Sequence, residues 1–244
     1  MLHSLGLCSV MKFYYYKDYE TMSEASAELM AQTVKQNPKA NLCLASGGSP
    51  ERTYSLFVEK LKNLDYAKMT LTKLDEWCGV AQDSPLSCER YLHELVLNPL
   101  QFPEDQFICF LPDSDDFNEE CIKVHRALQQ NPIDLCVLGL GRNGHLGLNE
   151  PNVYLKPYAH VAELSDKTKS HNMIKGSTLT QGMTIGMQEI MASKKVLLQV
   201  SGEDKEAIFA QLNKGEIDPM YPASFLWMHP NVEVHIRADQ FIQS

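Results

Sequence analysis

Residues 134–151 read DLCVLGLGRNGHLGLNEP, an apolar run that leads into a glycine-rich segment. The apolar part, 134–140, predicts a strand buried on both faces. Four glycines fall within the nine residues 139–147, where they add nothing to packing but let the backbone bend around a ligand. His145 and Glu150 lie five residues apart in this segment, and a carboxylate beside an imidazole forms a proton relay. We therefore predict a catalytic loop that follows a buried strand.

The rest of the chain alternates similar short apolar runs with longer amphipathic ones, which predicts strands alternating with helices. The other predicted strands are 41–45, 69–74, 107–111, 195–200 and 232–236. The predicted helices are 21–36, 50–63, 87–97, 118–130, 186–192 and 204–214. Because parallel crossovers need a helix-length connection, this order predicts an α/β fold: a three-layer, mostly parallel twisted sheet, Rossmann-like, with helices on both faces. Ligands of such sheets bind beyond the carboxyl ends of the strands.

A candidate phosphate loop follows the first predicted strand. Ser46, Gly47, Gly48 and Ser49 stand directly before Pro50, which suits the first turn of a helix. Two glycines allow close backbone approach, and the free N–H groups of a helix start attract an anion. An ordinary strand-to-helix turn with no ligand is the alternative.

Two adjacent carboxylates, Asp75 and Glu76, follow the threonine-rich strand 69–74. Neighbouring side chains of an extended chain point to opposite faces, so only one of them is expected to face the site. A carboxylate at a strand end is a candidate general base, and a helix cap or a solvated turn is the alternative.

The last candidate segment, Ser201 to Lys205, follows the strand 195–200 and opens another predicted helix. A lysine in a first helical turn opposes the helix dipole, so Lys205 suggests an anion to neutralise. The alternative is that Glu203 and Asp204 simply offset its charge.

The bulk composition is that of an ordinary globular chain. The 244 residues carry a net charge of −9, which gives no support to binding of nucleic acid or of an anionic membrane. Seven cysteines without metal-finger or C-x-x-C spacing indicate reduced thiols, and hence a cytoplasmic location. No apolar stretch reaches the roughly 20 residues of a membrane helix. We expect a short extension over 1–10, without a need for fixed structure, and a single domain over 11–244.

From about Met11 onward the chain resembles the glucosamine-6-phosphate deaminase/isomerase family, which shares its fold with the 6-phosphogluconolactonases. The resemblance rests on ASGGSPERTY, KLDEW, DLCVLGLGRNGHLGLNEP, VSGEDK and PASFLWMH, in family order and spacing. It implies a fold of the sugar-phosphate isomerase type and a catalytic set of Asp75, His145, Glu150 and Asn143. Asp75 would move a proton between C2 and C1 of the open-chain sugar, and His145, tuned by Glu150, would open the ring. The implied binding residues for the 6-phosphate substrate are Ser46, Gly47, Gly48, Ser49, Gly141 and Lys205.

The implied activity is aldose-ketose isomerisation with deamination, without metal or cofactor. The wording of the motifs is most similar to the galactosamine-6-phosphate branch, which would give tagatose 6-phosphate and ammonia; glucosamine 6-phosphate, giving fructose 6-phosphate, is the other substrate considered. The resemblance implies a hydrolase or isomerase of amino sugar catabolism with a small-molecule partner, and it is compatible with a homo-oligomer. The alternatives are a 6-phosphogluconolactonase and a non-catalytic sugar-phosphate sensor. A sensor would need a DNA-binding segment, for which the residues before Met11 are too few.

Two departures from the family pattern stand out. Asn143 replaces the acidic residue that glucosamine enzymes carry two positions before the histidine, so Glu150 would have to do more to stabilise an imidazolium. The region 169–175 offers lysines and His171 but no arginine for the phosphate. Phosphate affinity would then rest on Lys205 and backbone amides.

Overall fold

The computed structural model describes residues 11–170, 173–202 and 205–241. The predicted extension 1–10 lies outside the described residues, and so do His171, Glu203 and Asp204. No helix in the described ranges is both long enough and apolar enough to cross a membrane.

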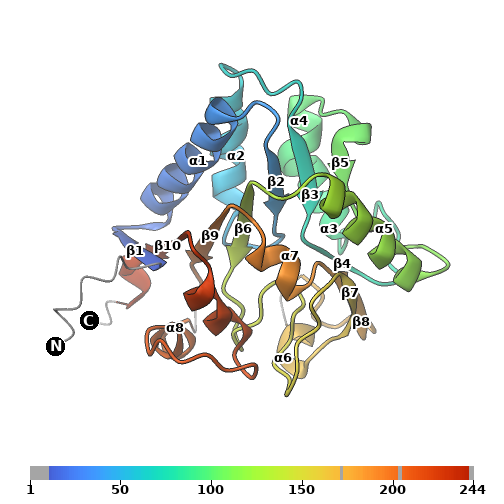
Figure 1. The fold of residues 1–244 in the computed structure, drawn as a ribbon, viewed down its shortest axis with the longest axis vertical. Helices are drawn as coiled ribbons and strands as arrows, with labels where there is room; N and C mark the ends of the chain where they lie inside the picture. The colour runs from blue at the N-terminus through green and yellow to red at the C-terminus, as the bar shows by residue number, and fades with distance from the viewer. Residues whose placement is uncertain (1–10, 171–172, 203–204, 242–244) are drawn as a thin grey trace.

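A seven-stranded sheet forms the centre of the fold (Figure 1). Its order is β1-β10-β9-β6-β2-β3-β5, and all six pairings are parallel. The strands are β1 (Met11–Tyr16), β2 (Asn41–Leu44), β3 (Thr70–Lys73), β5 (Phe107–Ile108), β6 (Leu135–Gly139), β9 (Lys195–Val200) and β10 (Val232–Arg237). All six predicted strands are therefore present, although β5 is shorter than expected.

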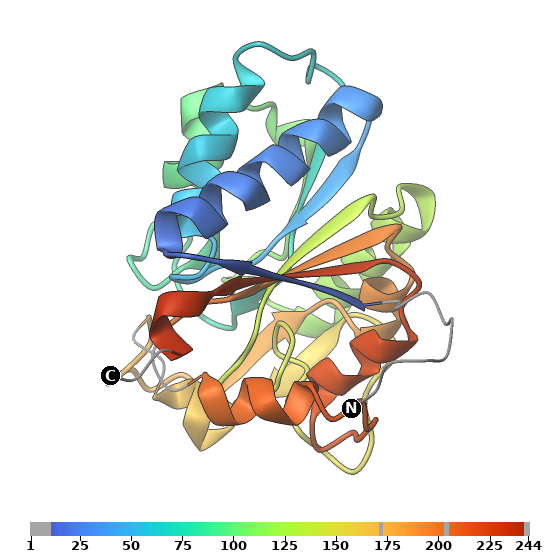
Figure 2. The ribbon, with the colours of Figure 1, turned by 90° about the vertical axis from the view of Figure 1, so that its left-hand side faces the viewer.

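Helices cover both faces of this sheet. Figure 2 shows α1 and α2 on one side and the C-terminal helices on the other. The helices are α1 (Tyr19–Gln36), α2 (Glu51–Leu61), α3 (Cys88–Leu92), α4 (Asn98–Leu100), α5 (Phe117–Gln130), α6 (Asp166–Lys169), α7 (Met187–Met191) and α8 (Glu206–Leu212). Short turns of other helix types are η1 (His93–Leu97), η2 (Glu104–Gln106), η3 (Pro222–Met228) and η4 (Ala238–Phe241).

Alternate residues of the central strands pack into two separate hydrophobic cores, because successive side chains of a strand point to opposite faces of the sheet. In β2, Leu42 and Leu44 pack with α1 and α2, whereas Cys43 packs on the opposite face with α5 and α7. Burial of both faces explains why these strands are almost continuously apolar. The predicted three-layer, parallel α/β fold is confirmed.

Helix starts differ slightly from the prediction because acidic caps precede the first apolar residue. Asp18 accepts a hydrogen bond from the N–H of Thr21 at 2.8 Å, so α1 begins two residues earlier than expected. The predicted helix 87–97 divides into α3 and the π-helical turn η1. Pro99 follows η1 and has no N–H to continue a regular helix.

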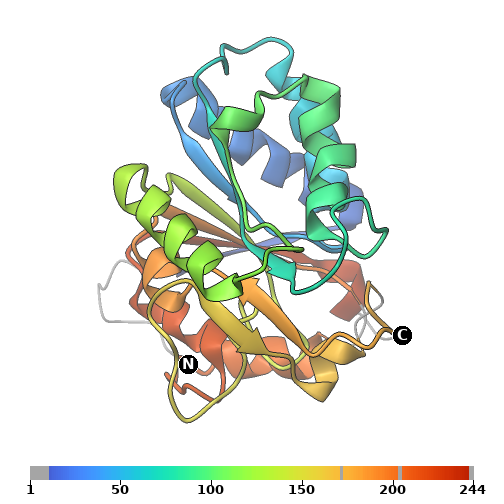
Figure 3. The same ribbon diagram turned by 90° about the vertical axis from the view of Figure 1, so that its right-hand side faces the viewer.

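A second, antiparallel sheet of order β4-β8-β7 was missed by the sequence analysis, as was β1. Its strands are β4 (Asp75–Trp77), β7 (His160–Glu163) and β8 (Gln181–Thr184). Figure 3 shows β7 and β8 side by side. Leu74 joins the two sheets, because its N–H bonds the Leu44 carbonyl at 3.1 Å and its carbonyl accepts from Ile185 at 3.0 Å. Asp75, the next residue, is thereby held at the junction.

Candidate active site

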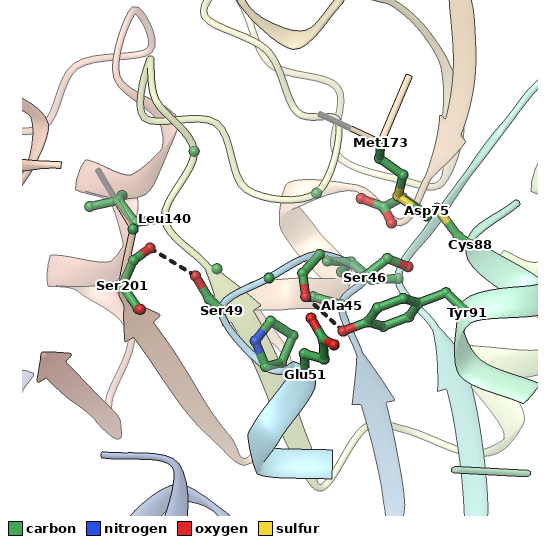
Figure 4. A pocket seen from close by; sticks show the side chains of 18 of the residues that line it. Ala45, Ser46, Ser49, Glu51, Asp75, Cys88, Tyr91, Leu140, Met173 and Ser201 are labelled. Carbon is green, nitrogen blue, oxygen red and sulfur yellow. Dashed lines mark hydrogen bonds between the residues drawn. The ribbon is translucent and has the colours of Figure 1, made fainter. Parts of the chain in front are cut away.

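One pocket collects the loops that follow the parallel strands. It encloses about 770 Å³ and is lined by residues after β2, β3, β6 and β9 (Figure 4). Asp75, His145 and Lys205 all line it, together with the loop 46–49. The four segments singled out in the sequence therefore meet at the carboxyl end of the sheet, as expected for this fold.

Asp75 is the partly buried carboxylate of the pocket (Figure 4). Removal from water raises the pKa of Asp75 to about 7, with a further contribution from the charge of Glu76, while Lys73 acts in the opposite direction. A carboxyl group with this pKa exchanges its proton readily near neutral pH, which suits a general base.

Glu76 points away from the pocket, as the alternation of an extended chain predicts. Its buried carboxylate accepts hydrogen bonds from the N–H groups of Cys88 and Glu89, at 3.0 and 2.8 Å, and from the ammonium of Lys73 at 3.0 Å. Glu76 thus anchors the start of α3 and the buried Lys73. The two adjacent carboxylates therefore differ in surroundings: Asp75 lines the pocket, whereas Glu76 stabilises the fold.

His145 and Glu150 form a close pair, with Nδ1 of the imidazole 3.6 Å from Oε2 of the carboxylate. Asn143 donates to the same Oε2 at 2.8 Å, and the hydroxyl of Thr168 donates to the other carboxylate oxygen. Burial by itself would raise the pKa of Glu150. Hydrogen bonding and charge from His145, then the bonds from Thr168 and Asn143, outweigh burial and lower that pKa to about 2. Glu150 is therefore an anion at any working pH.

Gly141 lies directly beneath the imidazole ring of His145. A Cβ atom at Gly141 would come within 2.2 Å of Cδ2 and 2.5 Å of Nε2 of that ring. The position therefore has to be glycine for the ring to occupy its present place.

The loop 46–49 has open space beside it. A Cβ added at Gly48 would meet no atom within 4 Å, and Gly47 has a φ of 115°, in the region that favours glycine. Ser49 donates its hydroxyl to the Ser201 carbonyl at 3.1 Å, which ties this loop to the segment after β9 (Figure 4). A ligand can therefore approach the backbone closely at Gly48.

Several basic side chains line the same pocket. The ammonium of Lys205 donates to the carbonyl of Leu140, and Arg237 is paired with Asp239 at 2.7 and 3.0 Å. Arg142 is exposed, and its guanidinium has no hydrogen bond or ion pair within the described ranges. The expectation that only Lys205 and backbone amides are available to an anion was incomplete. It considered arginines in 169–175 alone and left out Arg142 of the glycine-rich loop.

Sequence reasoning also missed Thr168, which lies in α6 and reaches both His145 and Glu150. The one local signal was Ser165, which caps α6 through the N–H of Thr168 at 3.2 Å. That signal predicts a short helix but not where it docks. Contacts 18 and 23 residues apart cannot be found from a local pattern.

The carboxyl end of this parallel α/β sheet brings a partly buried carboxylate, an imidazole and a glycine-rich loop to one pocket, which is the arrangement of an enzyme active site. The profile of the family described as "Glucosamine-6-phosphate isomerases/6-phosphogluconolactonase" matches residues 18–236. The chain belongs to this family.

Individual relatives agree with this membership. The chain is 39% identical over 221 residues to "Putative deaminase AgaI" of Escherichia coli (strain K12), covering 88% of this chain and 87% of that protein. A solved structure of a monomeric glucosamine-6-phosphate deaminase superposes with a TM-score of 0.88 at 32% identity, covering 93% of this chain and 97% of that one. These relatives confirm that the chain is an enzyme.

A 6-phosphogluconolactonase from Trypanosoma brucei superposes with a TM-score of 0.75 at 18% identity, covering 94% of this chain and 97% of that one. At this identity the likeness shows a shared fold alone. The comparisons support the isomerase and deaminase classes, whereas the hydrolase class has no support in this branch.

Proposed function

We propose that this enzyme converts an aminosugar 6-phosphate and water into a ketose 6-phosphate and ammonia. Galactosamine 6-phosphate, giving tagatose 6-phosphate, is the favoured substrate on the wording of the motifs, and glucosamine 6-phosphate, giving fructose 6-phosphate, is the second. The observation that carries the proposal is that Asp75 and His145 line one pocket with the loop 46–49, and that Glu150 pairs with His145.

In the proposed reaction His145 first opens the sugar ring by handling the proton of the ring oxygen. Its Nδ1 is turned to Glu150, so Nε2 is the nitrogen that a substrate would meet. The Glu150 carboxylate, anionic because its pKa is lowered to about 2, stabilises the imidazolium that forms. Asn143 cannot add negative charge there, but it holds Glu150 in place through its 2.8 Å hydrogen bond.

Asp75 then removes the proton from C2 of the open-chain aldehyde and returns it to C1. The electron pair of the broken C2–H bond forms an enol-like double bond between C2 and C1 while O1 takes up a proton. When C1 is protonated, the amino nitrogen gives up a proton, so that C1 becomes an alcohol and C2 an imine. Water adds to the imine, ammonia leaves, and the ketose phosphate remains. No electrons are gained or lost overall.

The 6-phosphate would bind between the N–H groups of the loop 46–49 and the cations Lys205 and Arg142. The open space beside Gly48 gives the phosphate oxygens access to the backbone. A guanidinium adds planar donors that a lysine lacks.

The proposal is tested by supplying galactosamine 6-phosphate, glucosamine 6-phosphate and 6-phosphogluconolactone in separate assays. Ammonia, ketose phosphate and free acid are measured. We expect equal amounts of ammonia and ketose phosphate from at least one aminosugar phosphate. Turnover of the lactone alone would establish the lactonase alternative and reject this proposal.

We predict that kcat/KM rises with pH up to about 7 and then levels, because Asp75 is a base only as the carboxylate. Its pKa is raised to about 7, so each pH unit below that value should lower kcat/KM about tenfold. The measurement is a pH–rate profile at low substrate concentration. An acidic limb centred near pH 4, where an ordinary aspartate titrates, would contradict the role of Asp75.

We also predict that Arg142→Ala raises KM about tenfold and leaves kcat within about twofold, because a charged hydrogen bond to phosphate is lost while the reacting carbons are untouched. Arg126→Ala is the matched control. Arg126 is an exposed arginine of α5 whose guanidinium lies 3.8 Å from Glu119, and it does not line the pocket. Equal KM values for the two variants would remove Arg142 from the phosphate site.

A further inference from the structure

Tyrosine hydroxyls hold the two glycine peptides of the loop 46–49. Tyr91, from α3, donates to the Gly47 carbonyl at 2.6 Å, which is a dashed line in Figure 4. Tyr19, at the start of α1, donates to the Gly48 carbonyl at 2.7 Å and accepts from the N–H of Arg52 at 3.1 Å. Two successive carbonyls of the most pliable part of the loop are therefore fixed by side chains from two different helices.

A third tyrosine acts at the root of the loop. The buried Tyr54, from α2, donates its hydroxyl to the Ala45 carbonyl at 2.7 Å. Its ring contacts that of Tyr91 edge-on, with ring centroids 6.5 Å apart. Three phenols from three helices thus bind three of four consecutive carbonyls.

The direction of these carbonyls decides the direction of the neighbouring N–H groups. A trans peptide is planar, so the N–H of each following residue points opposite to the carbonyl, and the described chain has no cis peptide. The N–H groups of Ser46, Gly48 and Ser49 therefore point away from the phenols. No intramolecular acceptor for these three N–H groups exists among the described residues, and the three residues that carry them line the pocket. The N–H groups are therefore available to a ligand.

We propose that Tyr91 and Tyr19 are positioning residues for the anion loop, and that their hydroxyls preset the backbone N–H groups which receive the phosphate of the substrate. The inference rests on the phosphate site of the proposed function. A glycine-rich loop without such contacts would have to be ordered when the ligand binds, which would weaken binding. Burial raises the pKa of Tyr91, so its hydroxyl keeps the proton that it donates.

Tyr91→Phe and Tyr19→Phe test the proposal, because each removes one hydroxyl and keeps the ring. We expect KM to rise about fivefold to tenfold in each, with kcat within about twofold of the unmodified enzyme, since one hydrogen bond is lost and the reacting carbons are untouched. The inhibition constant of inorganic phosphate should rise by the same factor. Tyr66→Phe is the matched control, because Tyr66 donates to the Leu100 carbonyl at 3.5 Å and does not line the pocket.

Calorimetric binding of inorganic phosphate separates this proposal from the proposed function, since it needs no turnover. Weaker phosphate binding in Tyr91→Phe and Tyr19→Phe, but not in Tyr66→Phe, supports the positioning role of the two tyrosines even if no aminosugar phosphate reacts. Unchanged phosphate binding in both variants overturns that role even if the enzyme is a deaminase. A fall in kcat with unchanged KM would likewise overturn it, because it would assign the hydroxyls to the chemistry.

Discussion

Asp75→Asn is expected to lower kcat about a thousandfold while KM changes little. Asparagine keeps the shape of the side chain but cannot accept a proton from C2, and removal of a general base typically lowers the rate by about 10²- to 10⁴-fold. Steady-state kinetics at pH 8, where Asp75 is ionised, give the comparison. Asp113→Asn makes the same change on an exposed aspartate outside the pocket and should leave kcat unaltered.

The same substitution should not weaken the fold. The pKa of Asp75 is raised from 3.8 to about 7, so between these values the folded protein holds a proton that the unfolded chain has released. The stability of the folded protein therefore falls as pH rises from about 4 to about 7, and the ionised carboxylate destabilises the fold at pH 8. Thermal unfolding of Asp75→Asn at pH 8 should show an equal or higher midpoint. A lower midpoint together with normal turnover would show that Asp75 is a structural residue.

The elements that the sequence predicted well are those whose signal is local. The run 134–140 contains β6, because a short apolar run that ends at glycines is typical of a strand buried on both faces. The glycines that follow predicted the loop from a local signal as well, since the conformational freedom of a glycine is a property of that single residue. Asp75 and His145 could then be assigned to one pocket, because parallel strands bring their carboxyl ends to one edge.

The antiparallel sheet had no such local signal. Gln181–Thr184 reads QGMT, which neither alternates nor forms an apolar run, and its partner strand Asp75–Trp77 lies about a hundred residues away. Pairing at that distance is decided by packing of the whole fold rather than by the residues of either strand. The two sheets meet at Leu74, so the position of Asp75 at their junction could not be predicted from the sequence.

Contacts made across the fold were missed for the same reason. The segments around Tyr91 and Thr168 carry no local sign of these contacts, and only the docking of α3 and α6 brings the two residues to the loop and to Glu150. Arg142 was visible in the glycine-rich segment from the start. Its importance depended on finding no carboxylate beside it in the described structure, which no sequence can show.

Glu150→Gln is expected to lower kcat about a hundredfold with a modest effect on KM. Glutamine preserves the side-chain shape and can still accept from Asn143, but it cannot offset the charge of a protonated His145. Ring opening and proton transfer through the imidazole then lose their electrostatic support. Because the pKa of Glu150 is lowered to about 2, the fall in kcat should be the same throughout the pH range from 6 to 9. A loss that appears only at the low end of that range would contradict this role.

Glu189→Gln is the matched control, because Glu189 forms a comparable pair with His125, 2.7 Å from its Nδ1, outside the pocket. It should leave kcat within about twofold. Stability supplies the second readout for Glu150→Gln. The pKa of Glu150 falls from 4.5 in the unfolded chain to about 2 in the fold, so its carboxylate stabilises the protein above about pH 4.5, and that stabilisation is lost as the pH falls through 2. Glu150→Gln should therefore unfold at a lower temperature at pH 8, whereas Asp75→Asn should not, because the pKa values of these two carboxylates are shifted in opposite directions.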